Sequence, residues 1–108
     1  GMPVSAQSFD WVDEGQRTRR VALVEGLAAP LLLVKARQGF LACAYIDLGT
    51  CDKLGEAAAI VSGVKSPEDM LRAKVKGASV AAARLGVKEG MSGAEALRLL
   101  DGPGRARL

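Results

Sequence analysis

The chain has 108 residues, of which 49% are hydrophobic and 25% charged, and a formal net charge of +3. This length and composition are typical of one folded domain and exclude a disordered chain. Histidine is absent, which excludes Ser-His-Asp and Cys-His catalysis and His-based zinc or haem sites. Two cysteines alone cannot complete an all-cysteine zinc site, and no spaced acidic loop is present for a hard cation. We therefore expect no metal and no cofactor.

Residues 2–8 lack a charged segment followed by an apolar one, so we expect no signal peptide. The longest apolar stretches are too short to cross a bilayer, and no membrane partner is expected. Two cysteines are too few for a disulfide framework, so a reducing cytoplasm is the simplest compartment.

The first expected elements are two strands at residues 9–12 and 18–27, joined by a turn at residues 13–16. Arg17, Arg19 and Arg20 lie at the start of the second strand, and the usual meaning of such a run is an exposed edge strand protected by charge. An anionic-ligand patch remains an alternative, as does an adaptor surface for protein or nucleic acid. A nucleic-acid partner is not expected, because neither interleaved aromatics nor a recognisable module accompanies the arginines.

Residues 31–46 predict a hairpin whose two strands are apolar on successive residues. The turn at residues 36–39 places Gly39 where a positive φ is expected. A strand of this composition favours burial on both faces of a sheet. Because a chain of this length has too few helices to cover both faces, we expect the second face to contact another copy of the protein.

The next segment predicts one helical turn followed by a third buried strand. Thr50 or Asp52 is expected to cap the turn, which ends at Leu54 before Gly55. Residues 57–61 are short, apolar and bounded by glycines, which favours a strand, although their three alanines leave a helix open.

The C-terminal part predicts two helices. Ser66 is expected to cap the first, with Pro67 at its first position. Its apolar stripe consists of Leu71, Val75, Ala78, Ala82 and Leu85, with a kink or break expected at Gly77. Ser92 begins a capping box for the second helix, which continues to Leu100.

These elements predict a single α+β domain spanning residues 1–108. Its expected sheet has four or five strands in mixed or antiparallel arrangement, with two main helices on one face. The ordered core is expected at residues 8–101, with flexible segments at 1–7 and 103–108.

Several segments together resemble the YunC-like family of small bacterial and archaeal domains of unknown function. They are Gly39–Tyr45, Lys53–Lys65, Glu68–Leu71, Leu85–Val87 and Gly90–Leu97, and the resemblance extends over residues 18–100. The sequence departs from the family pattern at Ala44 and Asp47, where the family shows glycine and asparagine. The resemblance implies a small α+β domain whose N-terminal β-region mediates tetramerisation, with no established activity.

Five residues are candidates for a site. At strand spacing, Cys43, Tyr45 and Asp47 share one face. A structural hydrogen bond from the Tyr45 hydroxyl is the default interpretation, and the alternative is one wall of a pocket completed by Lys65. Cys43 is interpreted as a small buried hydrophobe, with a reactive thiol as the alternative, while Cys51 is expected to be exposed. Lys65 and Ser66 place an ammonium, a hydroxyl and backbone amides together, which suits a small carboxylate or phosphate, but the favoured interpretation is a helix cap and a solvated lysine.

The favoured functional class is a homo-oligomeric small-molecule-binding or structural module of unknown biochemical role, with a tetramer as the expected assembly. The alternative is a small enzyme that uses Cys43 with Lys65 near a pocket at a subunit interface. Whether any catalysis occurs is left open by the sequence.

Overall fold

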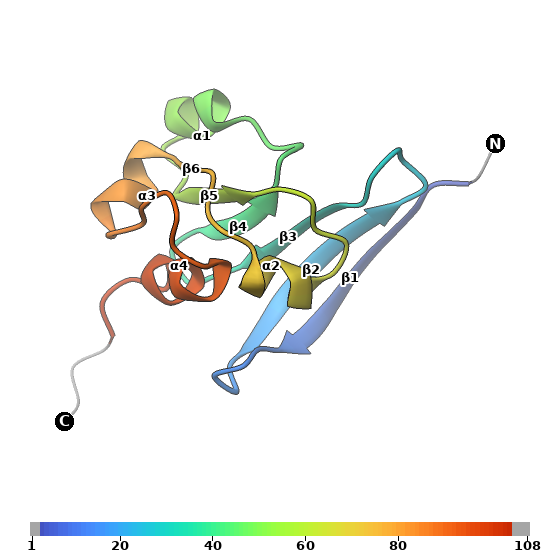
Figure 1. The fold of residues 1–108 in the computed structure, drawn as a ribbon, viewed down its shortest axis with the longest axis horizontal. Coiled ribbons are helices and arrows are strands. Elements are labelled where there is room, and N and C mark those ends of the chain that lie inside the picture. Colours follow the sequence, from blue (N-terminus) through green and yellow to red (C-terminus); the bar gives the residue numbers. More distant parts are fainter. Residues whose placement is uncertain (1–2, 105–108) are drawn as a thin grey trace.

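The computed structural model describes residues 3–104, and it contains six strands and four helices within that range (Figure 1). The elements in chain order are β1 (Ser5–Val12), β2 (Thr18–Glu25), β3 (Leu31–Lys35), β4 (Phe40–Cys43), α1 (Leu48–Leu54), β5 (Ala58–Val61), α2 (Pro67–Arg72), β6 (Gly77–Ala78), α3 (Val80–Arg84) and α4 (Gly93–Leu100). The α+β class and the mixed sheet are confirmed. The described chain has more strands and helices than expected, because β6, α1 and α3 are short elements.

The strands follow one another across the sheet in chain order, β1-β2-β3-β4-β5-β6. All neighbouring pairs are antiparallel except β4 and β5, which are parallel. A parallel pair needs a crossover connection, and α1 with its flanking loops supplies it. β1 is the edge strand at one side of the sheet, so β2, with its arginines, is an internal strand and not the edge that we expected.

The first strand begins at Ser5, inside the segment 1–7 that was expected to lie outside the core, and β2 ends at Glu25. At the other end of the chain, part of the expected flexible segment 103–108 lies outside the described residues, as does the very start of segment 1–7. Figure 1 shows the β1–β2 hairpin extending beyond the helices, which is consistent with a longest dimension of 53 Å.

The turn predicted between β3 and β4 is confirmed, with the Ala36 amide donating to the Gly39 carbonyl at 2.8 Å. The physical reason given for its glycine was wrong, because Gly39 is not among the positive-φ residues of the described chain. A Cβ at Gly39 would instead overlap the carbonyl oxygen of Ala57. The glycine therefore permits close packing against the start of β5.

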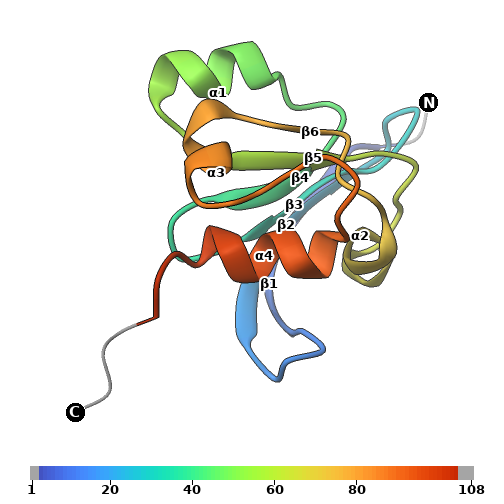
Figure 2. The ribbon, with the colours of Figure 1, turned by 60° about the vertical axis from the view of Figure 1, so that its left-hand side comes forward.

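Helix α1 begins earlier than expected. Asp47, and not Thr50 or Asp52, is its N-cap, with the Asp47 carboxylate accepting from the Thr50 amide at 2.8 Å. Figure 2 shows α1 on one side of the sheet and α2 with α4 on the other. The two main helices that were expected on one face, those that begin after Ser66 and Ser92, are α2 and α4, and they lie on the same side of the sheet.

The strand predicted within residues 57–61 is confirmed as β5, and the cap at Ser66 begins α2 as predicted. The long apolar stripe does not belong to one helix, because α2 ends at Arg72 and α3 begins only at Val80. Between them β6 pairs with β5, and the Lys76 amide donates to the Ile60 carbonyl at 2.7 Å. This pairing satisfies backbone groups along the open edge of β5. Those groups would lack partners if one continuous helix replaced β6.

The core lies between the sheet and the pair α2 and α4. Helix α4, with its predicted cap at Ser92, runs across β4 and β5 and contacts α2. The largest fully buried apolar side chains here are Leu32, Leu41, Met70, Leu97, Leu100, Val21, Val34 and Val61. Within residues 3–104, none of the helices has both the length and the apolar character needed to cross a membrane.

Candidate functional site

A hollow of about 350 Å³ lies beyond the carboxyl ends of the parallel strands β4 and β5. Three loops surround it, and in Figure 1 they lie on the right-hand side of the sheet. Its lining consists of Ala28, Ala29, Pro30, Cys43, Ala44, Tyr45, Gly63, Val64 and Lys65.

The topology explains why these loops meet. Cys43 and Val61 are paired in register as the last residues of β4 and β5, so the loops that follow them leave the sheet side by side. Strand β3 is antiparallel to β4, which places its first residue and the preceding Pro30 at the same edge. Ligands of sheets with parallel strands commonly bind outside the carboxyl ends of those strands.

Cys43 is 5% exposed, which confirms its predicted burial. Its Sγ lies 3.5 Å from the backbone nitrogen of Leu32, which donates a weak hydrogen bond to the sulfur. The thiol therefore lies at the inner end of the hollow, with its sulfur used as an acceptor by β3.

Tyr45 and Lys65 lie at the outer part of the lining, both with exposed side chains. Strand β4 ends at Cys43, so strand spacing does not continue to Tyr45, which lies in the turn that follows. The three residues still share one hollow, because the β4–α1 turn and the β5–α2 loop meet there.

Asp47 and Ser66, the other two candidates, do not line the hollow. Two hydrogen bonds from Thr50, one from its hydroxyl and one from its backbone amide, hold the pKa of the Asp47 carboxyl below its ordinary value. The Ser66 hydroxyl accepts from the Asp69 amide at 3.1 Å. Both side chains act as helix caps, the simpler of the interpretations for Ser66.

The sequence did not identify the loop at residues 28–30 or the pair Gly63 and Val64 as parts of the lining. Gly63 has a φ of 69°, a left-handed conformation that favours glycine and turns the chain from β5 toward α2. A usable signal was present, because two short apolar strands separated by a helical turn suggest a parallel β-α-β unit, whose carboxyl ends share one edge.

The expected exposure of Cys51 was wrong. Cys51 is 5% exposed, because α1 begins at Leu48 and turns this residue toward the sheet. Burial raises the pKa of the Cys51 thiol, and the negative charges of Glu56, Asp47 and Asp52 raise it further. Both cysteines are free thiols, and within residues 3–104 no three potential metal ligands come together.

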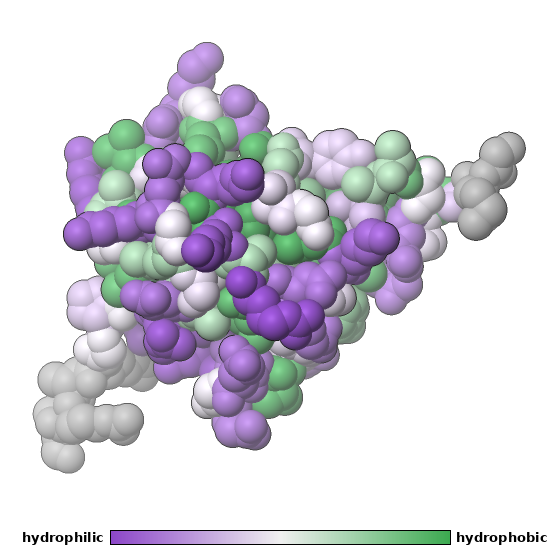
Figure 3. Space-filling view, viewed as in Figure 1, coloured by the Kyte–Doolittle hydropathy of each residue, from purple (hydrophilic) through white to green (hydrophobic). Residues whose placement is uncertain are grey.

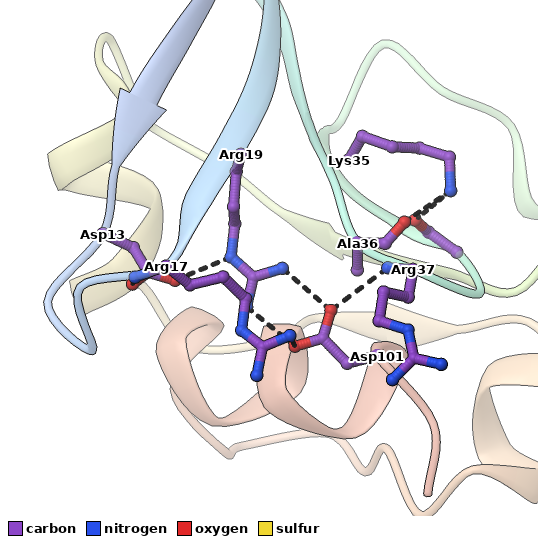
Figure 4. A network of polar contacts seen from close by, with 8 residues as sticks. Asp13, Arg17, Arg19, Lys35, Ala36, Arg37 and Asp101 are labelled. Atoms are coloured by element: carbon purple, nitrogen blue, oxygen red, sulfur yellow. Dashed lines mark hydrogen bonds and ion pairs between the residues drawn. The ribbon is translucent and has the colours of Figure 1, made fainter. Parts of the chain in front are cut away.

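A second polar cluster lies at the opposite end of β2 and β3 (Figure 4). Arg19 is 4% exposed, so the interpretation of its segment as an exposed charged edge is wrong for this residue. Its Nη1 and Nη2 each donate to the Asp101 carboxylate at 2.9 Å, and its Nε donates to Asp13 at 2.6 Å. Arg19 is two residues from the inward-facing Val21 and therefore shares its face of the strand, which was a sequence signal for this burial.

The carboxylates of this cluster have displaced pKa values. Burial raises the pKa of Asp101, but hydrogen bonds from Arg19 and the Arg37 amide, with the charges of Arg19 and Arg17, lower it below its ordinary value. Asp13 follows the same pattern, with burial opposed by Arg19 and the Arg17 amide. Burial lowers the pKa of Arg19, and its two carboxylate partners raise it above its ordinary value. The cluster therefore remains ionised at neutral pH.

Comparisons with known proteins identify the family. Residues 42–100 match a family model described as Domain of unknown function (DUF1805). The chain is also similar to a solved structure from Thermoplasma acidophilum, the crystal structure of a protein of unknown function called TA1206. The two are 30% identical with a TM-score of 0.82, and the match covers 93% of this chain and 97% of that one. No curated protein matches this chain. The expectation of a family of unknown function is confirmed, and the chain belongs to the family described as Domain of unknown function (DUF1805).

Proposed function

We propose that this protein is a homo-oligomeric module that binds a small molecule in the hollow beyond β4 and β5. The observation that carries this proposal is the convergence of Cys43, Tyr45 and Lys65 on one hollow of about 350 Å³. This volume lies at the lower end of the range for small-molecule pockets, which are mostly apolar with a few well-placed polar groups.

The lining favours a small carboxylate with an apolar body. Most of the lining residues are alanine, proline, valine and glycine, and the residues with a polar side chain besides Cys43 are Tyr45 and Lys65. One ammonium compensates one negative charge, and the apolar walls favour the burial of hydrocarbon.

The binding proposal is tested by NMR titration of the full chain with acetate, isovalerate and benzoate. We expect benzoate to bind more tightly than acetate and to shift amide signals of residues 28–30, 43–45 and 63–65. Lys65→Gln should weaken benzoate binding about tenfold, since hydrogen bonds to charged groups contribute roughly 1.5–3 kcal/mol. Lys88→Gln, a matched loss of one exposed charge, should leave it unchanged. Shifts outside the hollow, or equal effects of both variants, would contradict the proposal.

The oligomer is supported by the sheet face opposite α2 and α4. Leu31 and Leu33 point to this face, since they alternate with the buried Leu32 and Val34, and both remain partly exposed. Ala22 lies beside Leu33 in the register of β2 and β3 and is also partly exposed. Helix α1 lies over the β4–β5 side, so we propose that a second copy of the chain covers the β1–β3 side, in the tetramer that the family resemblance implies.

Sedimentation equilibrium at micromolar concentration tests the assembly. We expect a tetramer, or at least a dimer, and we expect Leu33→Asp to weaken association by several kcal/mol, because burying an unpaired carboxylate is costly. Val80→Asp, at an exposed position on α3, should leave the association unchanged. A wild-type monomer would remove the proposal.

We also propose a cytoplasmic location, in which both buried thiols remain reduced.

The alternative is an enzyme with Cys43 as nucleophile and Lys65 as its nearby cation, and the same hollow supports it because both residues line it. Iodoacetamide labelling of the native protein across pH, followed by mass spectrometry, distinguishes the two functions. A binding module should leave Cys43 and Cys51 unlabelled until the protein unfolds, because burial blocks access to both. Rapid labelling of native Cys43 near neutral pH, abolished by Lys65→Met, would favour the enzyme.

A further inference from the structure

A second hollow, of about 260 Å³, lies at the other end of β2 and β3. It is formed by the start of β2, the end of β3 with the following turn, and the residue after α4. Its lining consists of Arg17, Thr18, Arg19, Arg20, Lys35, Ala36, Arg37 and Asp101. Five of these eight residues are cationic and one is anionic, so the chemistry of this hollow differs from that of the first.

An internal ion pair occupies the buried part of the hollow. All three donor nitrogens of Arg19 are engaged with Asp13 and Asp101. The Asp101 carboxylate also accepts from the Arg37 amide at 3.1 Å and lies 3.5 Å from Nη1 of Arg17. Arg19 and Asp101 therefore compensate each other and hold the surrounding backbone in place.

The exposed cations are less well compensated. The Arg17 side chain is 52% exposed and has a single, long contact with Asp101, and Arg20 has one exposed ion pair, with Asp10 at 3.4 Å. Within residues 3–104, neither the Arg37 guanidinium nor the Lys35 ammonium has a carboxylate at ion-pair distance, and Lys35 donates to backbone carbonyls instead. Figure 4 shows the guanidinium groups of Arg17 and Arg37 on either side of Asp101.

Uncompensated like charges around one hollow are mutually repulsive, and a bound anion removes that repulsion. Guanidinium groups bind phosphate oxygens in a bidentate manner, and a phosphate offers more oxygens and more charge than a carboxylate. We infer that this hollow binds the phosphate group of a small phosphorylated molecule, with Arg17, Arg37 and Lys35 as its ligands. The lining contains no aromatic side chain on which a base of a single-stranded nucleic acid would stack, which favours a small ligand.

The test is a titration of the full chain with pyrophosphate at constant ionic strength, followed by NMR. We expect shifts in the amide signals of residues 17–20 and 35–37, and at least a tenfold loss of affinity in Arg37→Gln. Lys35→Gln should weaken binding in the same direction and provides a second variant of the same hollow. The matched control is Arg72→Gln, which removes the same charge from a side chain that is 71% exposed on α2. It should bind pyrophosphate as the wild type does.

Four outcomes would overturn the inference. The first is no shift by pyrophosphate beyond that of chloride at equal ionic strength. The second is an equal loss of affinity in Arg37→Gln and Arg72→Gln, which would assign binding to net charge. The third is loss of pyrophosphate binding in Lys65→Gln but not in Arg37→Gln, which would place the anion in the first hollow. The fourth is tighter binding of a short single-stranded DNA than of pyrophosphate, which would indicate a nucleic-acid surface.

Discussion

The two ends of the β2–β3 pair carry hollows of opposite character. At the end formed by residues 28–30, small apolar side chains line the walls and Lys65 is the cation of the lining. At the end formed by residues 17–20 and 35–37, most lining residues are cationic, and they include the buried ion pair of Arg19 and Asp101. One sheet thus supports two kinds of recognition, because the strand ends and loops, and not the sheet itself, determine the chemistry at each edge.

The two ends also differ in what holds them together. The basic end depends on Arg19 and Asp101, which are 82 positions apart and join β2 to the residue after α4. The apolar end depends on the parallel pairing of β4 and β5, which uses backbone groups, and on the helix caps at Asp47 and Ser66 that follow these strands. A single substitution should therefore affect stability more at the basic end.

The space-filling view shows polar side chains over much of the visible helical side, with apolar patches between them and along the β1–β2 hairpin (Figure 3).

The largest expected effect is that of Asp101→Ala. It leaves the Arg19 guanidinium buried without its bidentate partner, and removing one member of a buried pair costs about 3–5 kcal/mol. Urea unfolding of the variant and the wild type measures this loss. Asp10→Ala, which removes an exposed pair with Arg20, is the control and should cost no more than about 1 kcal/mol. Equal effects of the two variants would show that the basic end has no special role in stability.

Acid should destabilise the basic end first. The folded-state pKa values of Asp13 and Asp101 lie below the ordinary value of 3.8, so these carboxylates contribute stability above that pH. The contribution is lost as the pH falls from about 4 through the lower folded-state values. Urea unfolding at a series of pH values measures the loss, which should be shallower in Asp101→Asn because that variant has one such carboxylate fewer. The same pH slope in both proteins would contradict this assignment.

The smallest expected effect is at the apolar end. Ser66→Ala should reduce the free energy of unfolding by about 1 kcal/mol, because the hydroxyl that accepts from the Asp69 amide is lost. Ser62→Ala, in the loop before α2, is the control and should have little effect. Thermal or urea unfolding measures both. If Ser66→Ala kept full stability but lost benzoate affinity, Ser66 would belong to the binding site and not to the helix cap.

The features that were predicted best from the sequence are those that depend on neighbouring residues. The caps at Ser66 and Ser92 and the turn at residues 36–39 were identified correctly, since each depends on residues within a few positions. The apolar stripe from Leu71 to Leu85 was misleading as evidence for one helix. Its residues lie on different elements, because β6 pairs with β5 across the break at Gly77.

In the candidate sites, too, local features were predicted better than contacts between distant segments. Cys43 and Lys65, which the sequence offered as parts of one pocket, line the same hollow, but the walls at residues 28–30 and Gly63 were not identified. The burial of Cys51 was missed because it depends on where α1 begins, and the cap at Asp47, three residues before Thr50, places Cys51 inside the helix. Arg19 was grouped with its exposed neighbours because its carboxylate partners lie in other parts of the chain.

The sequence by itself determined the α+β class, the hairpins, the starts of α2 and α4 and the exclusion of histidine chemistry, because these depend on composition or on neighbouring residues. Only the tertiary structure decided that β4 and β5 are parallel, that their loops enclose one hollow, and that Arg19 is buried against Asp101. These features join segments that are distant along the chain. Their geometry is set by the packing of the sheet against α2 and α4, which no local pattern of residues records.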